Sequence, residues 1–383
     1  MPGPLHGIRV LDLTSVMLGP YATQMLGDLG AEVIKVESNE GDPIRQVGPG
    51  RSPGMAATFI NLGRNKKSVL LDLKTPAGLE SALRLAETCD VLAHNMRPAA
   101  MARLGLGYEP VRARKPDIIY AEAFGFAQEG PYADQPAFDD TIQAMAGLAH
   151  AQAAFGGEPA YHATIPADKT VAVYFVSAIL AALFHRQRTG EGQKVEVSMF
   201  ETMAGWMLAE HLYGAAFEPA MTPPIYPRVV SPHRRPYRTL DGYVALVAYN
   251  DRQWLRLFEA AGRPELLDDP RFATVAARTS NVDALYSEVA AIAATRTTQD
   301  CLRIFGEADV PVVPLMSTSD LLRDPHLASI GFFQIYDHVT EGQVRHVASP
   351  FRFSRTPVSV RSGAPRLGEH TQEVLAQVGG GGR

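Results

Sequence analysis

The sequence predicts an α/β protein with a parallel β-sheet covered by helices on both faces. Short runs rich in valine and isoleucine alternate with helical stretches over roughly the first 200 residues, which is the pattern of repeated βαβ units. Prolines are dense from Pro219 to Pro236 and separate this region from a second strand–helix region. A chain of 383 residues is long enough for more than one domain, each with a buried core.

The expected elements follow in order along the chain. Apolar runs predict strands at 8–13, 31–36, 69–73, 90–93 and 117–121. Gly19-Pro20 opens a first helix and Gly30 closes it, and a further helix covers 76–86. A long apolar helix runs from Lys169 to about Gln187, and is followed by a strand at 194–199, a helix near 200–216 and, beyond the prolines, a strand at 244–249 with helices to about Ala308.

These elements predict four segments. Residues 1–200 form the N-terminal part of a large domain, and 201–240 a helix and a proline-rich linker without regular structure. Residues 241–315 form a small domain, and 316–383 a return segment that completes the large domain.

Composition excludes several classes of partner. The charge sum of 36 Lys+Arg against 41 Asp+Glu gives −5, which argues against nucleic-acid binding. Cys89 and Cys301 cannot build a disulfide framework, and the histidines lack metal-ligand spacing, so no metal site is expected. The N-terminus lacks the apolar core of a signal peptide, and the run Val171–Phe184 is shorter than the ~20 residues that cross a bilayer. We expect a cytoplasmic protein that binds neither membrane nor nucleic acid.

The first strand–helix junction lies where dinucleotide folds bind pyrophosphate, and Glu37 ends the second strand as in such folds. Gly19, Gly27 and Gly30 do not form GxGxxG, so the tight turn that pyrophosphate needs is missing. The pattern favours a helix start that packs on the sheet over NAD binding.

Basic residues gather near the predicted strand ends. One group is Arg64, Lys66, Lys67 and Lys74, and the other is Arg97 and Arg103. Open α/β sheets bind ligands beyond the carboxyl ends of their strands, where cations suit phosphates. A solvated charged surface is the other interpretation of each of them.

Acidic residues precede two predicted helices. Asp168 stands directly before the long apolar helix, where an N-cap is the simplest interpretation. The same helix end stabilises a carboxylate, and a carboxylate kept ionised in a dry pocket can attack an activated acyl group. Asp139 or Asp140 is either a cap or a second carboxylate of a site. No HExxH, GxSxG or nucleophilic cysteine motif accompanies them.

Long motifs follow one another along nearly the whole chain. They read GIRVLDLTSVMLGPYATQMLGDLGAEVIKVE (7–37), GD (41–42), NLGRNKKSVLLDLKTPAG (61–78), CDVLAHNMRPAAMARLGLGYE (89–109), PDIIYAEAFGF (116–126), FDDTIQAMAGL (138–148), RTGEGQKVEVSMFE (188–201), YNDRQW (249–254) and RLGEHT (366–371). In this order they resemble the family III CoA-transferases (the CaiB/BaiF family), which include formyl-CoA transferase and the carnitine CoA-transferase.

The resemblance implies a fold, a nucleophile and a CoA site. The family's catalytic aspartate aligns with Asp168. The family's CoA contacts fall on Met17, Leu18, Leu71, Asp72, Leu73, Lys74, Asn95, Met96, Arg97, Arg103, Phe138 and Asp139. The implied architecture is a Rossmann-like large domain plus a smaller α+β domain, in an interlocked, threaded homodimer. CoA esters are then substrates, and no tightly bound cofactor is expected.

At several positions this chain differs from known members of the family, and these differences limit the reactions that we expect. In formyl-CoA transferase a glutamine that contacts oxalate stands where this chain has Met17, and an arginine that stacks on adenine stands where it has Ser38. The glycine-rich loop of that enzyme has no counterpart before Asp241. Oxalate and formyl-CoA are therefore not expected as substrates. Phe138 stands where 2-methylacyl-CoA racemases carry a histidine, so the alternative of a racemase or epimerase lacks one proton-transfer group. We expect CoA transfer from an acyl-CoA donor to a carboxylic acid through aspartyl anhydride and aspartyl-CoA thioester intermediates.

A basic group adjoins the proline-rich linker. It consists of His233, Arg234, Arg235 and Arg238. Arginines here bind the distal carboxylate of a dicarboxylic acceptor in one interpretation and cover an ordinary crossing surface in the other. Apolar residues of the linker, among them Ile225, Tyr226, Val229 and Val230, favour its burial against a partner subunit in an obligate homodimer.

Overall fold

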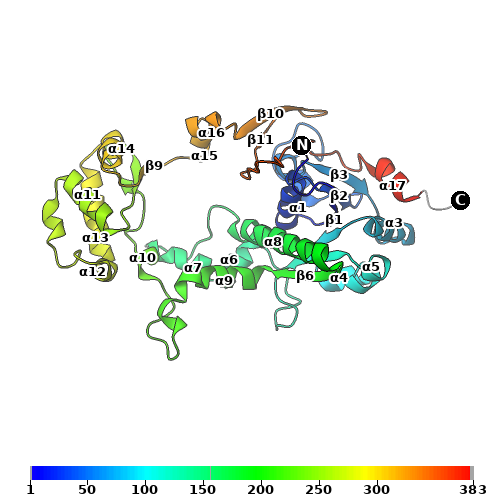
Figure 1. Cartoon of the computed structure of the whole chain (residues 1–383), viewed down its shortest axis with the longest axis horizontal. Helices are drawn as coiled ribbons and strands as arrows, with labels where there is room; N and C mark the ends of the chain where they lie inside the picture. The colour runs from blue at the N-terminus through cyan, green and yellow to red at the C-terminus, as the bar shows by residue number, and fades with distance from the viewer. Residues whose placement is uncertain (1, 156, 380–383) are drawn as a thin grey trace. The chain divides into compact units, whose positions relative to one another are not determined.

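The computed structural model describes residues 2–155 and 157–379, so residues 380–383 of the expected return segment lie outside it. The chain forms two compact units (Figure 1). Unit 1 takes in the chain up to Ala146, then Ala163–Gly205 and everything described from Pro325 onward. Unit 2 consists of Gly147–His162 and Trp206–Asp324. Unit 2 therefore contains the expected linker and small domain together with a short segment from earlier in the chain.

Unit 1 is built on a six-stranded sheet with the order β3-β2-β1-β4-β5-β6. All neighbouring strands in it are parallel. Its strands are β1 (Arg9–Leu13), β2 (Glu32–Glu37), β3 (Lys66–Leu70), β4 (Val91–His94), β5 (Ile119–Phe124) and β6 (Gln193–Ser198). This is the doubly wound order, in which ligands bind beyond the carboxyl ends of the strands. The predicted α/β class with a parallel sheet is confirmed.

Strand β3 begins three residues before the predicted run of 69–73. It starts at Lys66, because two of its polar side chains have buried hydrogen-bond partners. Lys66 donates to Asp12, and Ser68 donates to Glu37. Leu71–Leu73 follow the strand and belong to the loop beyond its carboxyl end. A search for apolar residues alone misses the start of such a strand.

Alternation along the strands sends neighbouring side chains to opposite faces. Leu11, Ile34 and Leu92 belong to one core cluster with residues of α3 (Pro76–Glu87), α5 (Tyr108–Arg114) and α17 (Thr371–Gly379). Asp12, next to Leu11, points to the other face and accepts a hydrogen bond from the hydroxyl of Thr23 in α1 (Leu18–Asp28). Helix α1 packs against α8 (Pro166–Thr189), and α8 also contacts β5 and β6. Helices therefore cover both faces of the sheet.

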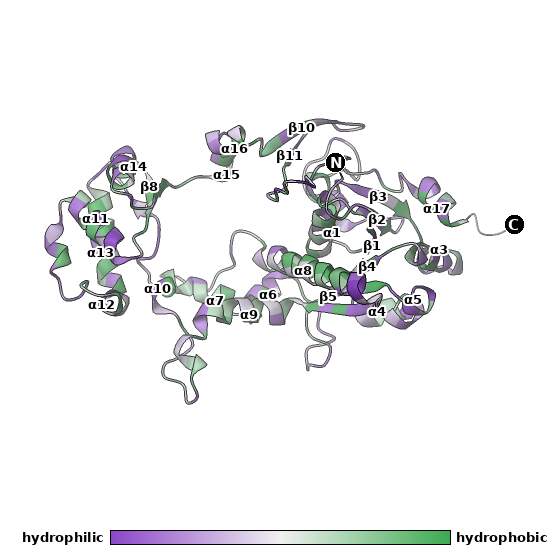
Figure 2. Ribbon diagram, viewed as in Figure 1, coloured by the Kyte–Doolittle hydropathy of each residue, from purple (hydrophilic) through white to green (hydrophobic). Residues whose placement is uncertain are grey.

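Helix α8 is long, apolar and only partly buried. By length and composition its 24 residues are enough to cross a membrane, so the expectation drawn from the shorter run Val171–Phe184 does not hold for the whole helix. Val171, Phe175 and Ile179 are buried, as in a core helix. Val173, Tyr174 and Phe184 stay 50%, 49% and 60% exposed, and Figure 2 shows apolar residues along much of the helix.

The C-terminal part of the chain returns to unit 1. A hairpin of β10 (Phe333–His338) and β11 (Gly342–Val347) precedes an irregular segment and then α17. The Oδ1 atom of Asn65 accepts hydrogen bonds from the backbone N–H groups of Arg361 and Ser362. Lys67 forms an ion pair with Glu373 of α17 at 2.7 Å.

Unit 2 has a core of its own. A three-stranded antiparallel sheet of β7 (Tyr237–Arg238), β8 (Tyr243–Leu246) and β9 (Val312–Pro314) packs with α11 (Asp251–Ala261), α13 (Val282–Ala294) and α14 (Thr298–Glu307). The proline-rich segment before it contains one short helix, α10 (Pro227–Val230), so the prediction of no regular structure there is wrong for that turn. Proline fixes its own φ near the helical value and lacks only an N–H that the first turn does not use, so Pro227 can start a helix.

The remaining helices are short, apart from α9. They are α2 (Ala57–Leu62), α4 (Pro98–Arg103), α6 (Asp139–Met145), α7 (Leu148–Gln152), α9 (Met199–His211), α12 (Val275–Ser280), α15 (Thr318–Leu321) and α16 (Pro325–Ser329), with 3-10 turns at Pro43–Gln46, Ala153–Phe155, Tyr213–Ala216 and Pro264–Leu267.

Candidate active site

The residues predicted to contact CoA follow the carboxyl ends of parallel strands. Met17 and Leu18 come after β1, Leu71–Lys74 after β3 and Asn95–Arg97 after β4. The Asn95 side chain joins two of these loops, because its Oδ1 accepts from the Ser15 N–H and its Nδ2 donates to the Ser15 carbonyl, both at 2.8 Å. The fold therefore brings these segments to one edge of the sheet.

A cavity of about 610 Å³ opens at this edge, and we call it the Lys74–Arg103 cavity. Its lining consists of Leu73, Lys74, Thr75, Pro76, Leu79, Ala100, Arg103 and Leu104. Leu73, Lys74 and Arg103 come from the predicted CoA set, whereas Asp168 is not part of this lining. Two cations in a lining that is otherwise mostly apolar suit a ligand with both phosphate groups and apolar parts.

The turn that carries Lys74 is held by local hydrogen bonds. The Lys74 N–H donates to Oδ1 of Asp72 at 3.0 Å, and Thr75 caps α3 by accepting from the Gly78 N–H at 3.1 Å. Glycine is required at position 78, because a Cβ there would lie 2.0 Å from the Asp72 carbonyl oxygen. Asp72 therefore shapes the loop on which Lys74 stands.

Three of the basic residues near the strand ends have structural partners. Arg64 pairs with Asp28 at 2.6 Å, and Lys66 with Asp12 at 3.2 Å. Lys67 pairs with both Glu32 and Glu373. These side chains are committed to ion pairs within unit 1, so of the first basic group only Lys74 lines the cavity.

A buried ionic network underlies the β1–α1 loop, and sequence reasoning missed it. Asp12, Lys35 and Lys66 are each at most 2% exposed. The Lys35 Nζ atom donates to the Thr14 carbonyl and to Oδ2 of Asp42, both at 2.8 Å. Burial alone would raise the pKa of Asp12, but Lys66 and Lys35 bring it below its usual value. The charged residues Asp12 and Lys35, each inside an otherwise apolar strand segment, are the signal by which the sequence could have indicated this network.

The network holds the loop before Met17 in a strained form. Val16 has a φ of 69°, in the left-handed region that β-branched residues rarely adopt. Its N–H donates to Oδ1 of Asp42 at 3.1 Å. Asp42 entered the sequence analysis only through the Gly41-Asp42 motif. In the structure it holds the backbone directly before Met17 and Leu18.

Glu37 is also committed within the fold. Its carboxylate receives Nε and Nη2 of Arg45 at 2.7 Å each, and Arg45 lies 3.7 Å from the ring centroid of Phe59. Glu37 is 5% exposed. It therefore serves as a structural partner of Arg45.

Asp168 lies inside the first turn of α8, and the prediction that it caps the helix is wrong. Ile165 is the N-cap and Pro166 the first helical residue. A proline at that position needs no N–H partner, so the helix starts two residues before Asp168. The Asp168 N–H, one of the unpaired donors of the first turn, donates to Oδ1 of Asp139 at 3.0 Å.

Asp139 is the second carboxylate at this point rather than a cap of its own helix. Phe138 is the N-cap of α6 and Asp139 is the first helical residue. Oδ2 of Asp139 accepts from Nε2 of Gln143 at 2.6 Å, and Asp139 is 5% exposed. Phe138 by contrast is 68% exposed. The two neighbours in the predicted CoA set therefore have opposite environments.

The Asp168 carboxylate has an unusual electrostatic environment. Burial, together with the nearby carboxylates of Asp139 and Asp140, raises its pKa to about 7. Among residues 2–155 and 157–379, no side chain donates a hydrogen bond to this carboxylate. A carboxylate that is poorly solvated and more basic than usual is a better nucleophile, and near neutral pH about half of it is ionised.

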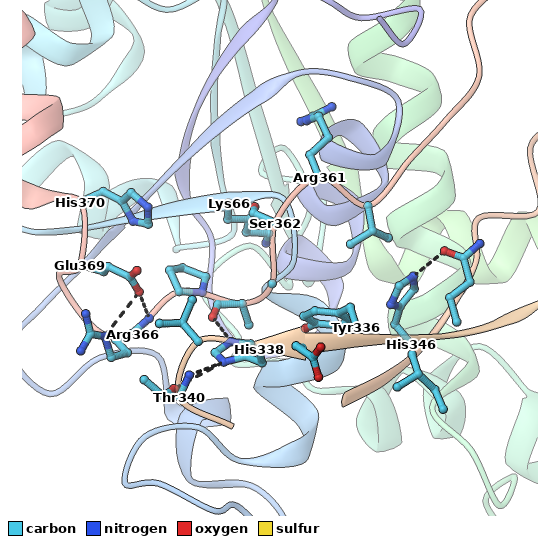
Figure 3. Close-up of a pocket in the computed structure, with 18 residues that line it drawn as sticks. Lys66, Tyr336, His338, Thr340, His346, Arg361, Ser362, Arg366, Glu369 and His370 are labelled. Carbon is cyan, nitrogen blue, oxygen red and sulfur yellow. Dashed lines mark hydrogen bonds and ion pairs between the residues drawn. The ribbon is translucent and has the colours of Figure 1, made fainter. Parts of the chain in front are cut away.

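A separate cavity of about 420 Å³ lies between the β10–β11 hairpin and residues 360–370, and the sequence did not point to it (Figure 3). Several of its polar groups are paired with one another. His338 contacts the Ala364 carbonyl at 2.7 Å, His346 contacts Gln334 at 3.2 Å, and Arg366 lies 3.7 Å from Glu369. Lys66 of the first basic group is part of its lining, whereas Asp168 and the predicted CoA contacts are not.

Known proteins are similar to this chain in sequence and in fold. A sequence profile described as CoA-transferase family III matches residues 5–371. Succinate--glutarate CoA-transferase of Agrobacterium fabrum is 34% identical, over 98% of this chain and 96% of its own length. Succinyl-CoA:mesaconate CoA-transferase of Haloarcula hispanica is 34% identical, over 99% of this chain and 97% of its own.

Among solved structures, the crystal structure of a CaiB/BaiF family protein from Brucella suis matches with a TM-score of 0.83 and 32% identity. The match covers 99% of this chain and 100% of that one. Profile, relatives and structure agree along nearly the whole length of the chain. The protein is a member of CoA-transferase family III.

Proposed function

We propose that this protein transfers CoA from an acyl-CoA donor to a dicarboxylic acid, with Asp168 as the nucleophile. The observation that carries the proposal is the environment of Asp168, a half-buried carboxylate with a pKa of about 7 and no hydrogen-bond donor on its oxygens among the described residues. Such a group attacks a thioester more readily than a solvated aspartate does.

The reaction proceeds by exchange at three carbonyl carbons, those of the donor acyl group, of Asp168 and of the acceptor. An Asp168 oxygen attacks the donor thioester, the C–S bond breaks, and CoA leaves as a thiolate. The thiolate attacks the aspartyl carbonyl of the resulting anhydride, which releases the donor acid and leaves an aspartyl-CoA thioester. The acceptor carboxylate displaces CoA from this thioester, and the thiolate then attacks the acceptor carbonyl, which regenerates Asp168.

The CoA part of the substrate is proposed to use the Lys74–Arg103 cavity. Lys74 and Arg103 are exposed cations of its lining, and the remaining predicted contacts follow β1, β3, β4 and β5. A dicarboxylic acceptor is supported by the two relatives, whose names specify succinate, glutarate and mesaconate.

The proposed assembly is an interlocked homodimer. Exposed apolar side chains support it, because monomeric proteins seldom leave so many large ones in water. They include Val173, Tyr174 and Phe184 of α8, Trp206 and Leu208 of α9, and Phe217, Met221 and Ile225 of the following segment. An intertwined partner would bury such residues.

Trapping of the covalent intermediate tests the function. The purified protein is incubated with succinyl-CoA and quenched with hydroxylamine, and its peptides are examined by mass spectrometry. We expect a hydroxamate on Asp168 that requires the CoA ester. Incubation of a 2-methylacyl-CoA in deuterated buffer tests the racemase alternative, since racemisation exchanges the α-proton and transfer does not. Exchange of the α-proton without formation of an Asp168 hydroxamate would refute the proposed CoA transfer and support racemisation.

A further inference from the structure

Unit 2 contains a cavity of about 310 Å³ that is lined by three arginines. Arg228, Arg234 and Arg235 border it, and we call it the arginine cavity. No aspartate or glutamate is part of its lining. Within the described residues, none of the three guanidinium groups has an ion pair with a carboxylate. The cavity thus gathers positive charge that the fold itself leaves uncompensated.

Part of this charge is held in a defined position. Nε of Arg228 donates to the Tyr286 hydroxyl at 2.9 Å, and its guanidinium carbon lies 5.4 Å from the ring centroid of Tyr249. Nε of Arg235 donates to the Pro232 carbonyl at 2.8 Å. These bonds occupy only some of the N–H groups of each arginine, so donors remain for a ligand.

Much of the remaining lining is apolar and buried. Leu246, Ala248 and Trp254 are each at most 6% exposed and belong to the core of unit 2. Tyr237 and Tyr286 are also buried. A pocket with an apolar wall and convergent guanidinium groups suits a short aliphatic chain that ends in an anion.

We propose that the arginine cavity binds a carboxylate group of the dicarboxylic acid acceptor. Planar guanidinium groups bind carboxylates in a bidentate manner, and the methylene groups of the acid would lie against the apolar wall. A phosphate shares part of this chemistry, but phosphate groups of CoA have their own candidate site at Lys74 and Arg103 in unit 1. The inference rests on the proposed function for its ligand and concerns how the acid is selected.

Fluorescence of Trp254 gives a test that needs no turnover. The chain has two tryptophans, Trp206 and Trp254, so Trp206→Phe leaves a single reporter in the cavity wall. The full-length protein is titrated with glutarate, with valerate and with inorganic phosphate, without any CoA ester. Valerate matches the length of glutarate but has one carboxylate, and phosphate distinguishes the two sources of negative charge.

We expect a saturable change with glutarate and at least roughly tenfold weaker binding of valerate. Arg234→Ala and Arg235→Ala should each weaken glutarate binding by roughly tenfold. Arg252→Ala is the matched control, because Arg252 lies on α11 with Trp254 but does not line the cavity. Thermal unfolding verifies that each variant is folded.

Three results would overturn the inference: no saturable response to glutarate, saturation by phosphate alone, or equal losses in Arg234→Ala and Arg252→Ala. An unchanged KM for glutarate in Arg234→Ala during active transfer would also overturn it and leave the proposed function standing. Saturable, Arg234-dependent glutarate binding in a protein that transfers no CoA would support the site and refute the proposed function instead.

Discussion

The backbone N–H of Asp168 donates a 3.0 Å hydrogen bond to the carboxylate of Asp139. This bond joins the first turn of α8 to the first residue of α6 and brings two acidic side chains together. Asp139 therefore satisfies a helix N-terminus and at the same time disfavours ionisation of Asp168. The arrangement ties the position of the candidate nucleophile to its basicity.

Asp168→Asn should abolish CoA transfer, because the amide is a poor nucleophile while its size and the backbone bond to Asp139 are unchanged. Transfer is measured with succinyl-CoA and a set of free dicarboxylic acids. Thermal unfolding and CoA binding should remain near those of the wild type. Activity within about tenfold of the wild type would reject Asp168 as the nucleophile.

The rate at low substrate concentration should rise with pH through about 7, because only ionised Asp168 attacks the thioester. Asp139→Asn keeps an oxygen that can accept from the Asp168 N–H and removes one negative charge. The midpoint of the acidic limb should therefore move to lower pH. Asp134→Asn removes the charge of an exposed aspartate and should leave the midpoint in place. An unmoved midpoint in Asp139→Asn would contradict the coupling.

Stability should show the same coupling. The pKa of Asp168 is higher in the folded chain than its ordinary value of 3.8, so the folded state binds more protons between about pH 4 and 7. The contribution of Asp168 is fully present below that window and is lost as the pH rises through about 7. Asp168→Asn should then be more stable than the wild type at pH 8 by about 1–3 kcal/mol, and not at pH 4, in urea unfolding.

Lys74→Ala and Arg103→Ala should each raise the KM of the CoA ester, by about 1–2 kcal/mol in binding free energy if the cation meets a phosphate. Added salt should reduce the effect. Arg84→Ala is the control, because Arg84 lies on α3, pairs with Glu80 and does not line the cavity. Comparison with dephospho-CoA esters identifies a residue that contacts the 3′-phosphate, since the loss would then disappear.

Asp12→Ala should destabilise the fold by about 3–5 kcal/mol, because it leaves Lys66 buried without its carboxylate partner. The free energy of unfolding is measured in urea. Glu109→Ala removes an exposed ion pair with Arg112 and should change stability by less than about 1 kcal/mol. Similar values for the two variants would mean that the network does not hold the β1–α1 loop.

Much of unit 1 could be predicted from local sequence. Alternating apolar strands and helices identified the parallel sheet, and the observed β1, β2, β4 and β5 lie within two or three residues of the predicted runs. The position of β3 could not be predicted this way, because the buried Lys66 is paired with Asp12, a residue 54 positions earlier. Asp168 was identified as a candidate nucleophile by resemblance of the surrounding motifs, since its spacing alone indicated a helix cap.

By itself, the sequence determined the α/β class, the order of the elements and the residues that follow each strand, because hydrophobic period and turn residues act over short distances along the chain. Only the tertiary structure decided which charges are structural, as for Lys35 with Asp42, and which gather with no carboxylate partner among the described residues, as for Arg228, Arg234 and Arg235. It also decided the pKa of Asp168, which depends on burial and on Asp139. Burial, ion pairing and like-charge repulsion depend on distances in space, and residues far apart in sequence set those distances only once the chain is folded.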